Sequence, residues 1–241
     1  MILNTGQRTD IPAFYSEWFC NRLREKQVLV RNPYNVSQLI RYRISPDVVD
    51  AICFCTKNPA PMLAHMELLA PFGQFWFVTI TPYGKSIEPN VPDKTEIIES
   101  FKALSKIVGA ERVAWRYDPI IIFEKYTVAQ HVQSFEKMCR ALAGFTKTCV
   151  ISFVDIYPKV RRNFPDVQEV AKDDKLALGK TFAKIGASYG MQIKACAEGN
   201  DLAQFGIDCS GCMTKAVYEA ALGCSLNIPE KTTRVKNATA I

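Results

Sequence analysis

Histidine is scarce in this chain, and no run of apolar residues is long. The 241 residues include two histidines, His65 and His131, which lie on predicted helices away from the cysteines. A Cys/His zinc finger is therefore not supported, and a Ser-His-Asp triad would have few candidates. No apolar run reaches the roughly 18 residues of a membrane span, and the N-terminus becomes polar too quickly for a signal peptide. We expect a soluble cytoplasmic protein without a membrane partner.

Composition excludes the disordered and collagen-like classes. Apolar residues make up 48% of the chain and charged residues 22%, which is ordinary for a globular protein. No repeat or low-complexity linker is visible, so we expect residues 1–241 to form one domain. Nine cysteines in a reducing compartment should stay reduced, which makes a disulfide framework the weaker interpretation.

The charge is modestly basic, with a formal net value of +6. This positive net charge suits an anionic partner, because a basic surface attracts anions over long range. We expect a small-molecule or anionic substrate. Nucleic-acid footprints usually show a denser basic stripe, so solvated faces are favoured and nucleic acid stays the alternative partner. The basic residues gather in three groups, which are Arg22, Arg24, Lys26 and Arg31, then Arg41 and Arg43, then Lys159, Arg161 and Arg162.

Apolar segments rich in β-forming residues alternate with amphipathic stretches. Predicted strands cover residues 2–5, 49–56, 75–81, 112–117, 148–155 and 192–196. Predicted helices cover residues 11–26, 59–70, 93–108, 127–142 and 173–189. This alternation indicates an α/β fold with a parallel sheet, and the length favours a (β/α) barrel of the TIM type, complete or partial. Turn residues at 32–35 predict a hairpin-like insertion near residues 28–47.

Polar residues follow most of the predicted strands. In a barrel the catalytic groups lie at the carboxyl ends of the strands, so these residues are the candidates for a site. For proton exchange or catalysis the candidates are Asp10, Lys57, Asp118, Asp155 and Glu198. For substrate binding they are Arg8, Thr9, Asn58, Thr81, Tyr83, Arg116, Tyr117 and Tyr157.

Some of these candidates have a structural alternative. Asp10 precedes Pro12, and Asn58 precedes Pro59, so both also fit helix N-caps. Lys57 could act as a Schiff-base nucleophile or a general base, or could bind an anion. The alternative is a lysine whose aliphatic stem packs on the barrel rim with its charged end in water.

Four cysteines near the end of the sequence have the spacing of a soft-metal site. They are Cys196, Cys209, Cys212 and Cys224. Two cysteines separated by two residues can bind one tetrahedral metal, so we expect zinc at a four-cysteine site within residues 196–224. Inert thiols and a redox dithiol are the alternatives. Cys53 and Cys55 share one face of a strand and fit small buried hydrophobic residues, as do Cys20, Cys139 and Cys149.

Several ordered motifs together resemble a known family. They are Arg8-Thr-Asp-Ile-Pro-Ala-Phe-Tyr15, Val30-Arg-Asn-Pro33, Thr56-Lys-Asn-Pro59, Thr81-Pro-Tyr-Gly84, Trp115-Arg-Tyr-Asp-Pro119, Cys196-Ala-Glu198, Cys212 and Leu222-Gly-Cys224. Over nearly the whole chain the sequence resembles the uncharacterised domain of unknown function 1848. The resemblance implies a barrel similar to radical S-adenosylmethionine enzymes, in which three cysteines of a C-terminal tail hold an iron–sulfur cluster and leave one iron open to the cofactor.

The sequence departs from this pattern where the tail should begin, near Arg234. It runs from Thr233 to Ile241 without a CxxxCxxC motif, which indicates a truncated or short member that lacks the cluster. Two functions therefore remain open. The first is a metal- or iron–sulfur-dependent enzyme acting on a polar or anionic substrate; the second is a zinc-stabilised binding protein without chemistry.

Overall fold

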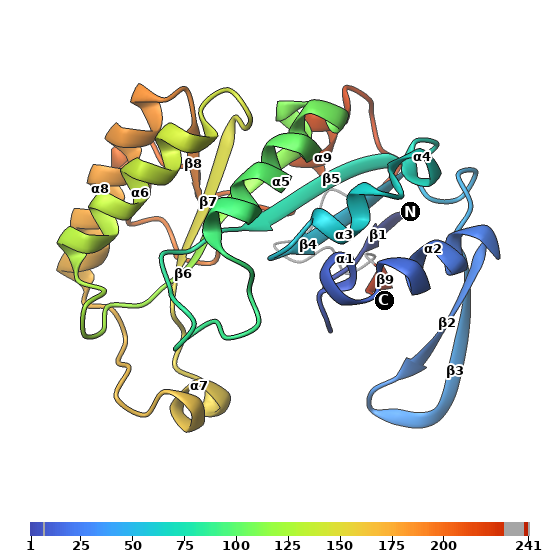
Figure 1. Ribbon diagram of the computed structural model, residues 1–241, viewed down its shortest axis with the longest axis horizontal. Coiled ribbons are helices and arrows are strands. Elements are labelled where there is room, and N and C mark those ends of the chain that lie inside the picture. The colour runs from blue at the N-terminus through green and yellow to red at the C-terminus, as the bar shows by residue number, and fades with distance from the viewer. Residues whose placement is uncertain (7, 229–238, 241) are drawn as a thin grey trace.

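Six strands form a parallel sheet in chain order (Figure 1). The computed structural model describes residues 1–6, 8–228 and 239–240. The six strands are β1 (Ile2–Asn4), β4 (Ala51–Thr56), β5 (Gly73–Thr79), β6 (Val113–Ile120), β7 (Thr148–Phe153) and β8 (Gln192–Ala195). A short strand, β9 (Thr239–Ala240), pairs in parallel with β1 at one edge. The predicted mixed α/β fold with a parallel sheet is confirmed.

The strand order is that of a barrel, but closure is not seen. Each strand pairs with the next along the chain from β1 to β8. Beyond β8 the chain returns as a single bridge, in which Asp208 pairs with Lys194. Within the residues that the structure describes, β8 and β1 do not pair. The consecutive order of the parallel strands is compatible with the predicted barrel, complete or partial, and closure is not shown among the described residues.

Helices connect the strands. They are α1 (Ile11–Phe14), α2 (Ser16–Arg24), α3 (Ala60–Leu63), α4 (Met66–Leu69), α5 (Lys94–Val108), α6 (Val128–Leu142), α7 (Pro158–Asn163), α8 (Lys172–Ser188) and α9 (Lys215–Leu222), with two 3-10 turns, η1 (Ala110–Arg112) and η2 (Ala203–Phe205). Two predicted helices are each broken in two. Tyr15, at φ −135°, separates α1 from α2, and His65, at φ −118°, separates α3 from α4.

Capping residues set the starts of the long helices. Thr127 Oγ1 accepts from the backbone N of Gln130 at the start of α6, over 3.3 Å. Thr214 does the same for Val217 at the start of α9. These bonds satisfy amide groups that have no partner inside the helix. Helix α5 ends at Gly109, whose φ of +97° a residue with a Cβ rarely adopts.

One face of the sheet carries an aromatic core, here called the helix-side core. Helices α5, α6 and α8 cover this face (Figure 1). Phe135 stacks on Phe182 with ring centroids 3.8 Å apart, and on Trp115 at 4.9 Å. All three side chains are fully buried. Burial of large aromatic side chains dominates core energetics, so this face supplies most of the packing.

The other face, here called the inner face, is covered by the segment that contains α9. Tyr218 of α9 is buried there and meets Phe75 edge to face, with ring centroids 5.6 Å apart. Cys53, Phe77 and Cys212 belong to the same core. Because successive strand residues point to opposite faces, each strand contributes to both cores.

The predicted insertion is a two-stranded antiparallel hairpin, β2 (Gln27–Asn32) and β3 (Asn35–Arg43). It forms a sheet of its own and projects from the end of the molecule that holds α2 (Figure 1). Leu29 and Val36 are exposed, and Tyr34 at its tip is 97% exposed. The hairpin therefore adds little to either core.

Candidate functional site

Polar and thiol side chains gather on the inner face at the carboxyl edge of the sheet. We call this group the strand-end cluster, and its members are Cys55, Arg116, Asp118, Ser152, Cys196 and Cys212. Arg116 and Asp118 alternate on β6 with Trp115 and Tyr117, which belong to the helix-side core. Parallel strands place their carboxyl ends at one edge, which is why residues far apart in sequence meet here.

Arg116 is held by an ion pair within the cluster. Its Nη2 pairs with Asp118 Oδ2, and Ser152 Oγ donates to Asp118 Oδ1. The guanidinium also lies over the Phe77 ring, 5.3 Å from its centroid. The side chains of Arg116 and Asp118 are 15% and 17% exposed. A guanidinium has five donors in a fixed plane, so Arg116 keeps donors that a ligand can use.

Two thiols meet beside Arg116. The Cys212 thiol donates to Cys196 Sγ across 3.2 Å. This hydrogen bond, with help from the Arg116 charge and against burial, lowers the pKa of Cys196 to about 7. The same bond and burial raise the pKa of Cys212. Cys196 is half-buried and Cys212 is buried. The pair therefore presents one reachable thiolate and one buried proton donor.

Two further thiols line the inner face on β4. Burial is the main cause that raises the pKa of Cys53 well above its ordinary value, and the neighbouring Cys55 thiol raises it further. Gly6 packs directly on Cys55, since a Cβ at Gly6 would lie 2.7 Å from the Cys55 Cβ and carbonyl oxygen. The backbone at Gly6, just after β1, therefore lies directly against the strand-end cluster.

The buried carboxylate of Glu88 pairs with two lysines, one just after β4 and one at the start of α5. Lys57 Nζ pairs with Glu88 Oε1 at 2.5 Å, and Lys94 Nζ pairs with Glu88 Oε2. Thr81 Oγ1 donates to Glu88 Oε2 at 2.9 Å. Burial raises the pKa of Glu88, but Lys57 and Lys94 outweigh it and the net shift is downward. The predicted candidates Lys57 and Thr81 thus converge on one acidic side chain.

Glu198 lies in a separate pocket of about 500 Å³ between α8 and β7. Its Oε1 accepts from the backbone N of Phe153 at 2.7 Å, and Lys175 Nζ lies 3.4 Å from its Oε2. Burial is the main cause that raises the pKa of this carboxyl group. Ala197, between Cys196 and Glu198, has the left-handed φ of +63°. This turn sends the thiol to the strand-end cluster and the carboxylate to the pocket.

Two predicted binding residues, Tyr83 and Tyr117, belong to the helix-side core. Tyr117 is 1% exposed, and its hydroxyl bonds to His131 Nδ1 at 2.7 Å, while His131 Nε2 donates to Ile121 O. The hydroxyl of Tyr83 donates to Pro119 O and accepts from Ile121 N. Both phenols are satisfied inside the protein, so the structure does not place them at a mouth.

Two other candidates serve as local supports. Asp10 Oδ1 accepts from Ala13 N and caps α1, while Oδ2 accepts from Lys57 N at 2.7 Å. Burial is the main cause that raises the pKa of Asp10. Asn58 Oδ1 accepts from Ala60 N at 3.2 Å. The capping alternative therefore describes Asp10, whereas the N-cap of α3 is Pro59 and Asn58 accepts from Ala60 N just before that helix.

The remaining candidates lie on the surface. Arg8 and Thr9 are exposed, and Arg8 Nη1 donates to Arg31 O at the hairpin. Asp155 is exposed, and Tyr157 is 53% exposed. They lie outside the strand-end cluster, although the charge of Asp155 acts on Glu198.

The four late cysteines do not come together as one site. Cys196 and Cys212 are in contact, but Cys209 packs against the helix-side core and Cys224 is exposed. Cys209 lies beside β8 at the opposite face from Cys212, which separates the two thiols of the pair at 209–212. In the described part of the chain, no three His, Cys, Asp or Glu side chains are placed to hold a metal ion.

This donor set fits neither the predicted zinc site nor an iron–sulfur cluster. A structural zinc needs four ligands and a cluster that binds S-adenosylmethionine needs three cysteines, whereas two of the predicted cysteines meet here. The segment from Thr233 to Ile241, where the family's cysteine-rich tail would begin, lies largely outside the described residues. No reaction step is therefore derived through a metal or a cluster.

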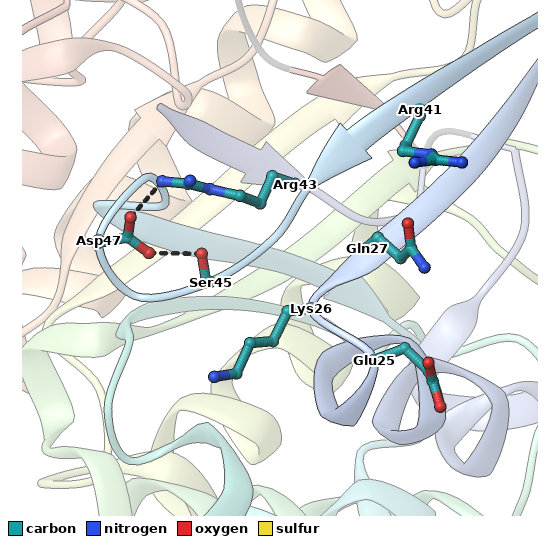
Figure 2. A pocket seen from close by; sticks show the side chains of 7 residues that line it. All are labelled: Glu25, Lys26, Gln27, Arg41, Arg43, Ser45 and Asp47. Atoms are coloured by element: carbon teal, nitrogen blue, oxygen red, sulfur yellow. Dashed lines mark hydrogen bonds and ion pairs between the residues drawn. The ribbon is translucent and has the colours of Figure 1, made fainter.

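A further hollow lies at the base of the hairpin, away from the strand-end cluster (Figure 2). It is an open groove of about 640 Å³. Arg43 pairs with Asp47, and Ser45 Oγ donates to the same carboxylate (Figure 2). Lys26 and Arg41 line the groove together with the acidic Glu25. Its mixed charges and openness give no convergent set of reactive groups, so the smaller strand-end cluster is the better candidate.

Sequence reasoning missed Glu88 and Ser152 and treated Cys55 as packing alone. Glu88 lies in the loop after β5, where no periodic pattern marks it. The shared face of Cys53 and Cys55 was visible, and combining it with the inward positions of β6 and β8 would have indicated Cys55.

Comparison with known proteins gives little beyond the family. A crystal structure from Bacteroides thetaiotaomicron VPI-5482, provisionally named an alpha-L-fucosidase, is similar at 13% identity over 72% of each chain, with a TM-score of 0.35. This likeness is too distant to carry an argument. No curated protein matches the chain. No helix in the described residues is long and apolar enough to cross a membrane. The pattern of the family described as domain of unknown function (DUF1848) matches residues 2–239, and the chain belongs to that family.

Proposed function

We propose that this protein is an enzyme that uses the Cys196 thiolate as a nucleophile on a polar, anionic substrate bound by Arg116. The observation that carries the proposal is the hydrogen bond from Cys212 to Cys196 at the carboxyl edge of the sheet, where the Arg116 charge helps to lower the pKa of Cys196. A thiolate stabilised by a hydrogen bond and a guanidinium is an activated nucleophile. An arginine beside it favours a substrate with a carboxylate or phosphate group.

Each neighbour in the cluster has a supporting part. Asp118 fixes the guanidinium plane through its ion pair, and Ser152 in turn orients Asp118. These two are positioning residues. Cys212 keeps its proton and donates to the thiolate. When Cys196 Sγ forms a bond to an electrophilic carbon, the leaving group departs with its electron pair and the Cys212 thiol is the nearest proton donor.

Iodoacetate and iodoacetamide test this proposal without knowledge of the substrate. In either reagent the sulfur–carbon bond forms while the carbon–iodine bond breaks and iodide leaves. The two reagents differ in one charge. We expect the iodoacetate to iodoacetamide rate ratio at Cys196 to exceed that at the exposed Cys224 by about tenfold, which corresponds to about 1.4 kcal/mol. Peptide-resolved mass spectrometry of the full chain gives both rates in one sample.

The matched variants are Arg116→Gln and Arg140→Gln. Arg140 is a surface residue whose side chain is 73% exposed. The first variant should lose the iodoacetate preference at Cys196, and the second should keep it. An unchanged preference in Arg116→Gln would exclude Arg116 as the anion-binding group. Alkylation of Cys196 no faster than Cys224 at pH 7 would exclude the activated thiolate.

A further inference from the structure

Cys196 and Cys212 are placed to react with each other as well as with a substrate. Their sulfur atoms are 3.2 Å apart, and both thiols are free in the structure. A disulfide has a sulfur–sulfur bond of about 2.05 Å, so the two atoms need to approach by only about 1.2 Å. The two cysteines are 16 positions apart in the sequence, so a short-spacing motif such as CxxC does not indicate this pair.

The surroundings favour movement of one partner. The backbone N of Cys196 donates to Ile151 O at 2.9 Å, which fixes Cys196 against β7. Cys212 lies outside any helix or strand, next to Gly211 at φ +104°. A fixed thiol facing a thiol on an irregular segment is an arrangement in which a small backbone change closes the bond.

The other cysteines are less suited to this reaction. Cys20, Cys53, Cys139 and Cys149 are buried. Cys209 packs on the other side of the sheet, and Cys224 is exposed at the end of α9. Exchange requires an accessible thiolate that attacks first and a second thiol within reach that resolves the intermediate. Cys55 is half-buried, but its neighbour on the same face of β4 is the fully buried Cys53. Cys196 with Cys212, whose sulfur atoms are 3.2 Å apart, meets both conditions.

We infer that Cys196 and Cys212 form a reversible dithiol–disulfide pair that is oxidised by low-molecular-weight disulfides. Cys196 attacks one sulfur of the reagent, forms a mixed disulfide and releases one thiol. Cys212 gives up its proton and attacks Cys196 Sγ, which releases the second thiol. The protein loses two protons and two electrons, and the reagent is reduced to two thiols.

The inference does not require the proposed enzymatic reaction. If both hold, the disulfide removes the Cys196 nucleophile and switches the site off. Rapid alkylation of Cys196 without disulfide formation would support the proposed function and contradict the dithiol–disulfide pair. Disulfide formation at a Cys196 that shows no preference for iodoacetate would support the dithiol–disulfide pair and contradict the proposed function.

The experiment equilibrates the reduced full chain with mixtures of glutathione and oxidised glutathione, followed by quenching with N-ethylmaleimide. Peptide mapping should show an internal link between the Cys196 and Cys212 peptides, with two fewer of the nine cysteines alkylated. Dithiothreitol should restore both. Cys209→Ala is the matched control, since it removes a neighbouring thiol and should leave the link intact, whereas Cys212→Ala should stop the reaction at a glutathione adduct on Cys196.

Three results would overturn the inference. The first is a persistent glutathione adduct on Cys196 in the unmodified protein, because Cys212 would then fail to resolve it. The second is a link that joins other cysteines. The third is stoichiometric zinc or iron in the anaerobically purified protein together with protection of both thiols until a chelator is added, since the pair would then be a ligand set.

Discussion

The two faces of the sheet differ in what their side chains do. The helix-side core stacks Phe135 on Trp115 and Phe182. The inner face gathers thiols and an ion pair at its carboxyl edge. Strand β6 supplies both, because its successive side chains point to opposite faces. The difference shows that one set of strands can carry an aromatic core on one face and a cluster of thiols and charges on the other.

Removal of an aromatic ring from the helix-side core should have the largest effect on stability. Phe135→Ala leaves a cavity among rings that stack at 3.8 and 4.9 Å. We expect a loss of about 3–5 kcal/mol in the free energy of unfolding, measured by urea denaturation. Ser152→Ala on the inner face is the contrasting change and should cost about 0.5–1.5 kcal/mol. Equal losses would break the distinction between the two faces.

A smaller effect is expected from the buried polar pair on the helix side. Tyr117→Phe leaves His131 Nδ1 without the donor that lies 2.7 Å away. Burial keeps His131 neutral by lowering its pKa, so the lost bond is not replaced by protonation near pH 7. We expect a loss of about 1–3 kcal/mol by the same measurement. Tyr34→Phe at the exposed hairpin tip is the control and should change stability little.

The smallest effect concerns the ion network at the strand ends. The pKa of Glu88 is lowered in the folded state, so its contribution is present above its unfolded value of 4.5 and is lost as the pH falls through the lower folded value. Because Lys57 is 37% exposed, solvent weakens the pair and we expect about 1 kcal/mol or less at pH 7.

Unfolding curves for Glu88→Gln at pH 7 and below pH 4 test this contribution. The variant should lose stability at pH 7 and match the unmodified protein in acid. Glu99→Gln, at a carboxylate that is 66% exposed, serves as the control. A deficit that persists in acid would show that Glu88 acts through packing instead of charge.

The fold was largely predictable because each strand is a local apolar segment. All six predicted strands and the hairpin occur within a few residues of their expected bounds. The breaks at Tyr15 and His65 were not predicted, since both residues interrupt otherwise continuous amphipathic patterns. Helix α9 was not predicted either, because its apolar stripe, formed by Val217, Tyr218 and Leu222, is short.

The site was only partly predictable, because its contacts join distant residues. Arg116 and Asp118 were indicated by charges at the end of an apolar strand, and the structure pairs them. The contact of Cys196 with Cys212 depends on how the chain returns across the sheet, which spacing does not encode. The same return separates Cys209 from Cys212, which is why the four-cysteine grouping does not form.

The left-handed turn at Ala197 lies between Cys196 and Glu198. It directs the Cys196 thiol to the strand-end cluster and the Glu198 carboxylate to the pocket beside α8. Only one residue separates the thiol of the strand-end cluster from the carboxylate of the pocket beside α8, so the two sites share one short segment of backbone.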